Sequence, residues 1–308
     1  MPTGSSHPSS PAFRPIASAV CAGLLVVSCG APPEPRTEVR ETAPPTELVA
    51  PVVAKAPDST RSFLTAAEFH DAVRSANPGY NGGAALVTDA ARRVVQANLS
   101  GCGLRRLEPF ADVALEVLDL SDNPVEDLAP LRGMPLRILL LDATRVADLE
   151  PLAGTKLERL SLVGAPVVDL RPLMQSQIIE LDLRRTRVSD LSPLAVMPVE
   201  ELRLDGTRVQ DLSPLATCPL RVLTVSNTPV RDLSPLAGRP LRVLDIAGTG
   251  VTDVTPLAKT QLQRLFFTRE RIRSGLDELR ALRSLREIGD PQHSHRPAPQ
   301  YWQETDAK

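Results

Sequence analysis

The chain has 308 residues, of which 42% are hydrophobic, and its formal net charge is −2 at pH 7. This length and apolar content can fill a sizeable core, and the charge balance shows no polyelectrolyte bias. Near-neutral charge argues against duplex nucleic acid as a ligand, because proteins that bind it carry basic stripes. Only 3% of the residues are aromatic, which indicates a core built from Leu and Val.

Residues 1–28 predict a signal peptide. Arg14 precedes an apolar stretch, residues 16–27, that is too short to span a bilayer comfortably, and small residues precede the expected cleavage point. The stretch ends in Val26-Val27-Ser28-Cys29-Gly30, which resembles the bacterial lipobox. That resemblance implies a lipoprotein whose Cys29 is lipidated and becomes the new N-terminus. An ordinary signal peptide with an incidental cysteine is the alternative, and an uncleaved apolar anchor is a further one.

Residues 29–60 predict a tether between the lipid and the folded domain. The stretch is rich in proline, which favours extended polyproline-like conformations, and it cannot form a core. At ~3.1 Å per residue it would reach roughly 90 Å when fully extended. Such a tether would hold a domain clear of a lipid surface.

Residues 61–93 predict an N-terminal cap. Thr65 and Glu68 form a capping-box pattern at the start of a helix over 62–76, and Asn77-Pro78-Gly79 ends it. Residues 85–87 and 93–95 predict a short pair of strands. Solenoids need such a cap to cover the first exposed edge of the core.

Residues 94–261 hold eight repeats of 21 residues without an insertion or deletion. Apolar residues recur at unit positions 1, 4, 6, 11, 14 and 17, with Pro at 16 and Asp at 13 in seven of the eight units. A fixed period in this range is the mark of a solenoid. The units begin at Val94, Leu115, Leu136, Leu157, Ile178, Val199, Leu220 and Leu241.

The sixth unit, residues 199–219, illustrates the physics of one coil. Leu202 and Leu204 are two positions apart, so they face the core from a short strand while Arg203 faces water. Thr207 follows where the chain turns, and its hydroxyl can bond backbone groups. Ser213 before Pro214 predicts a short helical turn on the convex side, with the serine as N-cap. Stacked units then form one parallel sheet on the concave side, an α/β solenoid.

The repeats resemble the leucine-rich repeat family, and more narrowly the short bacterial subclass that reads L-x-L-x-x-T-x-V-x-D-L-S-P-L. The resemblance implies a right-handed leucine-rich repeat solenoid with a parallel concave sheet and helical caps. The flanking segments 77–80 (NPGY) and 299–304 (PQYWQE) resemble elements that border such arrays in multidomain bacterial proteins, many of which carry a kinase domain. This sequence contains no G-x-G-x-x-G, H-R-D or D-F-G motif, so kinase activity is not inferred.

Residues 262–308 predict a C-terminal cap and tail. Leu262 and Leu265 keep the strand pattern, whereas apolar residues between Ile272 and Leu285 recur at helical spacing. We therefore expect an amphipathic helix that covers the last repeat. The tail from residue 294 carries Tyr301 and Trp302 and either docks back on the domain or is loose.

The sequence offers few groups for catalysis. Cys102 and Cys218 fall in units one and six, roughly 24 Å apart at ~4.8 Å per coil, so they cannot form a disulfide and we expect two buried thiols. No histidine belongs to a catalytic or metal-ligand spacing; the histidines are His7, His70, His293 and His295. We therefore expect no enzyme activity and no cofactor.

An acidic column contributes one aspartate per unit. Such a column could form a calcium ladder, but each unit supplies one carboxylate and calcium needs six to eight oxygens. The interpretation we favour is that each aspartate accepts backbone N–H bonds before the helical turn. The column consists of Asp127, Asp148, Asp169, Asp190, Asp211, Asp232 and Asp253.

The concave face is the candidate binding surface, because side chains at unit positions 3, 5 and 7 point away from the core. Its centre is charged and consists of Arg159, Glu180, Asp182, Arg184, Glu201, Arg203 and Asp205. Apolar side chains flank this centre: Val117, Ile138 and Leu140 on one side, and Val222, Val243 and Phe266 on the other. Arginines at position 10 add a basic edge: Arg145, Arg187 and Arg208.

These features predict a monomeric, lipid-anchored protein of the bacterial cell envelope that binds a protein partner through its concave face. A charged centre with apolar shoulders suits complementary charge combined with burial. The membrane is contacted through the N-terminal lipid, and no nucleic acid partner is expected. The alternative is a structural envelope scaffold or spacer without a specific ligand.

Overall fold

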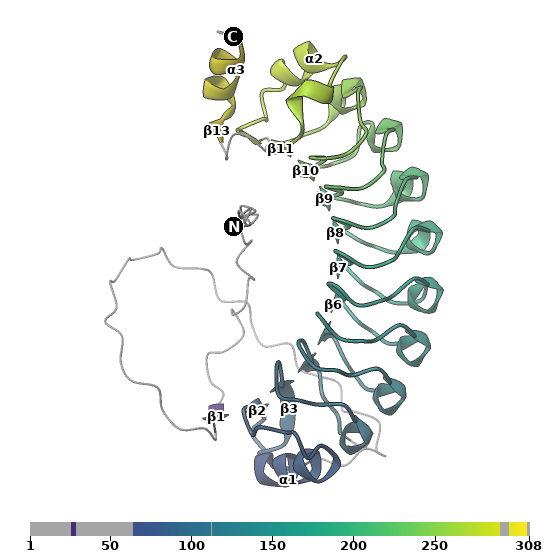
Figure 1. Ribbon diagram of the computed structural model, residues 1–308, viewed down its shortest axis with the longest axis vertical. Coiled ribbons are helices and arrows are strands. Elements are labelled where there is room, and N and C mark those ends of the chain that lie inside the picture. The colour runs from purple at the N-terminus through teal and green to yellow at the C-terminus, as the bar shows by residue number, and fades with distance from the viewer. Residues whose placement is uncertain (1–25, 29–63, 112, 290–295, 307–308) are drawn as a thin grey trace, which may run out of the picture.

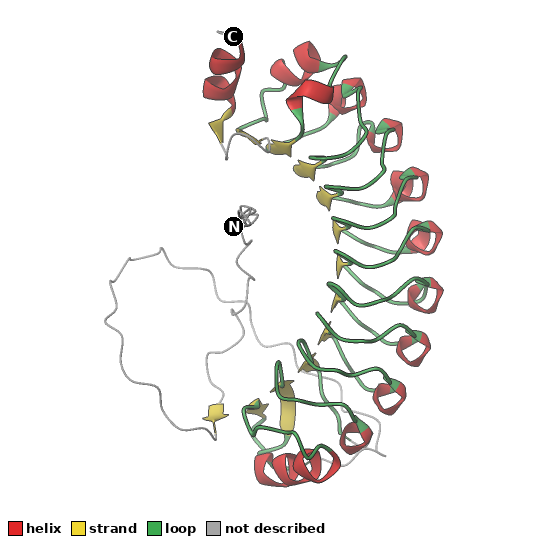
Figure 2. Ribbon diagram, viewed as in Figure 1, coloured by secondary structure: helices red, strands yellow, loops and turns green. Residues whose placement is uncertain are grey.

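The computed structural model describes residues 26–28, 64–111, 113–289 and 296–306. The predicted tether, Cys29 and most of the predicted signal peptide lie outside the described residues. Figure 1 shows a curved solenoid whose strands follow the inner side of the curve, with α1 at one end and α3 at the other. Figure 2 shows that short helical turns occupy the outer side. The structure is a leucine-rich repeat solenoid in architecture, as the repeat pattern predicts.

Within the described residues, the strands form one 13-stranded sheet in chain order. β1 (Val26–Ser28) pairs antiparallel with β2 (Ala85–Thr88), and β2 pairs antiparallel with β3 (Val94–Asn98). From β3 to β12 all neighbouring strands are parallel. The repeat strands are β4 (Val117–Asp119), β5 (Ile138–Leu140), β6 (Arg159–Ser161), β7 (Glu180–Asp182), β8 (Glu201–Arg203), β9 (Val222–Thr224), β10 (Val243–Asp245) and β11 (Arg264–Phe266).

The core follows the predicted apolar register. In the sixth unit Leu202, Leu204, Val209 and Leu215 have no exposed surface, and Leu212 is 1% exposed. The same unit positions are buried in the neighbouring coils, so the leucines form columns along the solenoid. A single coil could not remove these side chains from water, and the stacking of coils therefore stabilises each unit.

Each coil turns on the convex side through a 3-10 helix with proline at its start, which confirms the predicted helical turn. The predicted serine N-cap is wrong, because a leucine precedes the helix and Ser213 is its first residue. Asp211 accepts the Ser213 N–H at 2.8 Å instead, since a carboxylate two residues earlier reaches the free donor more readily. The turns are η1 (Glu108–Phe110), η2 (Ala129–Leu131), η3 (Glu150–Leu152), η4 (Arg171–Leu173), η5 (Ser192–Val196), η6 (Ser213–Thr217), η7 (Ser234–Leu236) and η8 (Thr255–Lys259).

The N-terminal end of the array is covered by α1 (Ala66–Ala76). Its capping box is present: the Thr65 hydroxyl accepts the Glu68 N–H, and the Glu68 carboxylate accepts the Thr65 N–H at 2.9 Å. Phe69 on this helix meets Phe110 of the first unit edge to face, with ring centroids 5.4 Å apart. These contacts place an aromatic pair over the open edge of the leucine columns.

The C-terminal end differs from the predicted amphipathic helix over 272–285. The turn η9 (Arg269–Arg271) precedes that segment, which contains only the short helix α2 (Leu276–Arg280), and then β12 (Glu287–Gly289) adds to the parallel sheet beside β11. Gly275 precedes α2 with a φ of 90°, a left-handed conformation that prevents a continuous helix through this point. The segment is therefore one further coil.

The tail docks on this last coil. β13 (Arg296–Pro297) pairs antiparallel with β12, and α3 (Ala298–Asp306) follows it. Tyr301 is buried, and its ring centroid lies 6.1 Å from that of Phe267. The guanidinium of Arg280 lies 5.6 Å from the Trp302 ring. The structure thus favours docking over the loose alternative.

Candidate functional site

The concave surface of the sheet carries all seven predicted site residues in its central coils. They arise from β6, β7 and β8 and from the two turns that follow β7 and β8. Most are partly exposed, whereas Asp182 is only 9% exposed. The backbone ladder places them in a fixed register, since Arg159 stands beside Glu180 and Glu180 beside Glu201. The strand register places these residues together on one face, and their role in binding stays a prediction.

Three ion pairs neutralise most of this centre. Arg159 of β6 donates to Glu180 of β7 at 2.7 Å. Within single coils, Arg184 contacts Asp182 at 2.7 Å through two nitrogens, and Arg203 contacts Glu201 at 2.8 Å. The hydrogen bonds to Asp182 also raise the pKa of Arg184 above its usual range. The charged centre is therefore a set of pre-oriented dipoles and carries little free charge.

The remaining acidic residue of the centre, Asp205, joins two neighbouring coils. It accepts hydrogen bonds from the Thr224 hydroxyl at 2.6 Å, the Ser226 N–H at 2.8 Å and the Ser226 hydroxyl at 2.7 Å. Asp142 makes the same kind of bridge, to the Ser161 hydroxyl at 2.5 Å and the Val163 N–H at 3.0 Å. Each aspartate satisfies donors at the carboxyl end of the next strand.

Two concave aspartates that the sequence interpretation did not single out have altered acidity. Burial, assisted by the nearby Asp205 carboxylate, raises the pKa of Asp245 to about 7 against the opposing hydrogen bond from the Ala247 N–H. Burial also raises the pKa of Asp142. Asp245 is at position 5 of its unit and Asp142 is at position 7, so the repeat register could have identified both as concave residues.

The apolar shoulders are less exposed than the sequence suggests. Val243 is 7% exposed, and Val222 is half-buried. The Phe266 ring lies over Gly289 of β12, where a β-carbon would collide with it. Val117, Ile138 and Leu140 on the other shoulder are half-buried. The shoulders therefore offer rims of aliphatic surface and one aromatic ring held against backbone.

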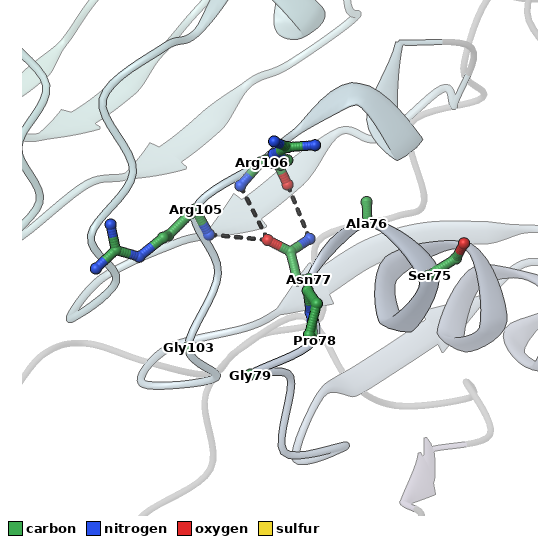
Figure 3. A pocket seen from close by; sticks show the side chains of 8 residues that line it. All are labelled: Ser75, Ala76, Asn77, Pro78, Gly79, Gly103, Arg105 and Arg106. Carbon is green, nitrogen blue, oxygen red and sulfur yellow. Dashed lines mark hydrogen bonds between the residues drawn. The ribbon is translucent and has the colours of Figure 1, made fainter.

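A hollow lies at the junction of α1 and the first repeat, and Figure 3 shows its lining. The Asn77 side chain crosses the hollow. Its Oδ1 accepts hydrogen bonds from the backbone N–H groups of Arg105 and Arg106 at 2.9 Å, and its Nδ2 donates to the backbone carbonyl of Arg106 at 3.0 Å. Tyr80 of the same NPGY segment contacts His70 Nδ1 at 2.6 Å. The motif therefore joins the cap to the array, and we assign it a structural role.

The acidic column on the convex flank serves the backbone, as predicted. Each of its aspartates accepts the N–H two residues later at 2.7–2.9 Å. Within the described residues no group of three or more His, Cys, Asp or Glu side chains is placed to hold a metal. The bonds to Ser192, Ser213 and Ser234 lower the pKa of their partner aspartates, which therefore remain ionised.

The other chemistry-bearing residues lie apart from the concave surface. Cys102 and Cys218 are free and buried, and burial raises the pKa of both thiols. His70 is on the N-terminal cap, and burial lowers its pKa. Cys29, His7, His293 and His295 fall outside the described residues. Among the helices of the described ranges, none combines the length and apolar character needed to cross a bilayer.

Comparisons with solved structures find proteins with the same architecture. An internalin (inlF) from Listeria monocytogenes aligns with a TM-score of 0.60 and 23% identity over 71% of this chain and 67% of its own. An internalin C2 (inlC2) from the same species aligns with a TM-score of 0.55 and 26% identity over 67% of this chain and 94% of its own. These likenesses identify a leucine-rich repeat protein by fold.

A third similar structure comes from a plant. The ectodomain of the receptor kinase GASSHO1/SCHENGEN3 from Arabidopsis thaliana, in complex with CASPARIAN STRIP INTEGRITY FACTOR 2, aligns with a TM-score of 0.50 and 21% identity. The alignment covers 65% of this chain and 27% of that chain. The chain matches no protein-family model, and the comparison with curated proteins finds no match.

Proposed function

We propose that this protein is a non-enzymatic interaction module that binds a protein partner through the concave surface of its sheet. The observation that carries the proposal is the pre-oriented polarity of β6 to β8, where one ion pair crosses between two paired strands and two lie within single coils. A rigid surface loses little conformational entropy on binding, so its contacts convert more fully into affinity. Leucine-rich repeat proteins of the same fold include one solved as a complex with a binding partner.

The two parts of the surface would act differently. The aliphatic shoulders around Ile138 and Val222 would supply burial of apolar area, which gives affinity. The ion pairs around Glu180 and Arg203 would read the charge pattern of the partner, because an unmatched pattern leaves charges desolvated and unpaired. Such a surface selects partners by the polarity of its dipoles more than by net charge.

A polarity swap tests the proposal without breaking the pairs. Exchanging Arg159 for Glu and Glu180 for Arg keeps the ion pair and the net charge but inverts its direction, and Glu201→Arg with Arg203→Glu does the same one coil away. We expect the four-residue swap variant to keep its thermal stability and to lose the partner captured by photo-crosslinking in living cells. Undiminished capture of the same partner by the swap variant would contradict binding at this centre.

A scaffold or spacer without a specific ligand is the second candidate. Pairwise neutralisation of the concave charges favours it, because the centre then satisfies itself without a partner. The crosslinking experiment separates the two functions. A wild-type protein that captures no partner from any concave position would favour the scaffold.

The location of the protein at the envelope rests on the sequence. We propose that Cys29 carries a lipid, that residues 29–60 form the tether and that the solenoid works as a monomer at the membrane surface of a bacterium. Metabolic labelling with an acyl-chain analogue is expected to mark the wild-type protein and not the Cys29→Ala variant. Equal labelling of both proteins would contradict lipidation at Cys29.

A further inference from the structure

The edge of the concave sheet that follows β7 and β8 carries free positive charge. Arg185, Arg187 and Arg208 are exposed there, and in the described part of the chain none of their side chains forms an ion pair or hydrogen bond. The three arginines that face the concave centre are each neutralised by a carboxylate. The unpaired positive charge of these coils therefore lies at one edge of the sheet.

The backbone holds this edge in a fixed row. The Arg187 N–H donates to the Val167 carbonyl at 3.0 Å, and the Arg208 N–H donates to the Val188 carbonyl at 3.1 Å. These equivalent bonds place the two arginines in adjacent coils, ~4.8 Å apart along the sheet. The Cγ atom of Arg185 lies against Gly206, so its side chain leans toward the coil that carries Arg208. Three like charges thus gather within two coils, and an anion between them would relieve their mutual repulsion.

The backbone at Arg185 is in an unusual state for a long side chain. Its φ is 58°, in the left-handed region, where the flanking coils place Gly164 and Gly206. A non-glycine residue in this region is strained, and such strain is found most often at functional positions. Asp122, Ala143 and Asn227 occupy the same unit position and also have positive φ, so the left-handed backbone is a property of the repeat, and Arg185 is the long side chain among these residues. The turn of the repeat therefore sets this conformation, and Arg185 carries a long cationic side chain on it at some cost in backbone strain.

We propose that this edge, formed by Arg185, Arg187 and Arg208, docks an extended acidic segment of the protein partner. The inference rests on the proposed function and adds the chemistry of the partner and the place where it is read. Guanidinium groups bind carboxylates in a two-pronged geometry, and neighbouring coils present them ~4.8 Å apart, which the long side chains can match to carboxylates of one extended chain.

Charge on the adjacent flank favours a narrow ligand over a broad anionic surface. Asp190 and Asp211 follow Arg187 and Arg208 by three residues, where the chain enters the convex turns, and both are exposed. Hydrogen bonds from the following serines lower the pKa of both carboxyls, which keeps them negative. A lipid bilayer or a nucleic acid would meet these carboxylates together with the arginines, whereas a single extended segment fits along the basic row.

A labelled peptide tests the charge requirement in vitro. The probe is fluorescein-labelled decaglutamate, titrated with the full-length chain at low ionic strength and followed by fluorescence anisotropy. Arg187→Gln with Arg208→Gln is expected to weaken binding at least about tenfold, since two charge-assisted hydrogen-bonding groups are lost. The matched control is Arg242→Gln with Arg286→Gln, which removes two other exposed arginines outside this edge and is expected to change affinity less than about twofold.

Three outcomes would overturn the inference. The peptide could fail to bind the wild-type chain, or both double variants could weaken it equally, which would indicate net charge only. Tighter binding of phosphatidylglycerol vesicles or of a random DNA duplex than of the peptide, with the same dependence on Arg187 and Arg208, would replace the acidic segment with another class of ligand.

Arg185 supplies an independent test, because strain and binding predict opposite effects. Arg185→Gly should raise the melting temperature by about 2 °C, because it relieves the left-handed strain. The same variant should bind the peptide more weakly. Arg185→Lys should keep most of the affinity. A glycine variant that gains stability and keeps full affinity would assign Arg185 no role in docking.

Crosslinking in cells separates this inference from the proposed function. Loss of the partner by both the polarity swap and the Arg187/Arg208 variant, with Asp- or Glu-rich crosslinked peptides at the edge, would support both proposals. Loss by the swap alone would overturn the edge and keep the concave site. Unchanged capture by both variants would contradict the two proposals together.

Discussion

Aspartates on both sides of the solenoid accept backbone N–H groups, but those on the convex flank are exposed and those on the concave side are partly buried. On the convex flank, Asp190 and Asp232 accept backbone N–H groups while exposed, and hydrogen bonding lowers their pKa values. On the concave side, Asp142 and Asp245 accept backbone N–H groups as well, yet burial raises their pKa values. The comparison shows that desolvation, more than the number of hydrogen bonds, decides the ionisation of a carboxyl group in this fold.

The largest effect should come from removing the concave bridge at Asp205. Replacement by alanine leaves the Ser226 N–H and two hydroxyls without their acceptor, and we expect the free energy of unfolding to fall by about 3 kcal/mol. Urea denaturation at pH 7 measures the loss. The Asp205→Asn variant keeps one acceptor and should lose less, so equal losses in both variants would contradict the hydrogen-bond explanation.

Replacing Asp245 should raise the stability of the protein, whereas replacing Asp205 should lower it. Because the folded-state pKa of Asp245 is about 7 and its ordinary value is 3.8, the folded protein binds a proton more tightly, and stability falls as pH rises through this interval. A shift of this size corresponds to about 4 kcal/mol, which partial exposure screens to about 2 kcal/mol. Asp245→Asn should therefore stabilise the protein by that amount at pH 8.

Denaturation curves at pH 4 and pH 8 check this prediction. At pH 4 the wild-type carboxyl is already protonated in the folded state, so the advantage of the asparagine should nearly vanish. Asp205→Asn should also lower the pKa of Asp245, because it removes a neighbouring negative charge. An advantage of Asp245→Asn that does not depend on pH would point to packing in place of ionisation.

A smaller loss is expected on the convex flank. Asp232→Ala removes the acceptor for the Ser234 N–H and should cost about 1 kcal/mol, which is typical of losing a cap at a helical start. Thermal unfolding of the variant is the measurement, with the exposed Arg242→Gln as a neutral surface control. A loss of stability as large as that of Asp205→Ala would contradict the expected difference between concave and convex aspartates.

The smallest effect should appear in acid. The pKa of Asp232 is lowered, so its contribution to stability is present above its ordinary pKa of 3.8 and is lost as pH falls through the lower folded-state value. Asp232→Asn should therefore narrow the stability difference between pH 5 and pH 2 by a few tenths of a kcal/mol. A wider difference would mean that the carboxylate is not stabilised in the folded state.

The repeat register was predictable because one coil repeats the same physical problem. The two-residue alternation at Leu202 and Leu204, the turn at Thr207 and the acceptor at Asp211 follow from local geometry alone. The last coil was missed since Leu262 and Leu285 stand 23 positions apart, outside the 21-residue period. The spacing of Leu285 and Ile288 repeats the L-x-x-L pattern and could have revealed β12.

The arrangement of charges on the concave face was less accessible. A glutamate at position 3, such as Glu180, can reach an arginine in its own coil or in the neighbouring one, and the sequence treats both as equal. The structure joins it to Arg159 across two strands, whereas Glu201 pairs within its own coil. The burial of Asp245 likewise depends on the packing of several coils, which no single unit encodes.

Because the strands pair in strict register, the length of this molecule can change only by whole coils. Every coil from the first unit to the eighth advances by the same number of residues, and each strand pairs with the next without a shift. Deleting or duplicating one whole unit would move α1 relative to α3 in steps of ~4.8 Å and leave both ends intact. Whole-unit deletions and duplications would therefore set the length of the protein in steps of one coil.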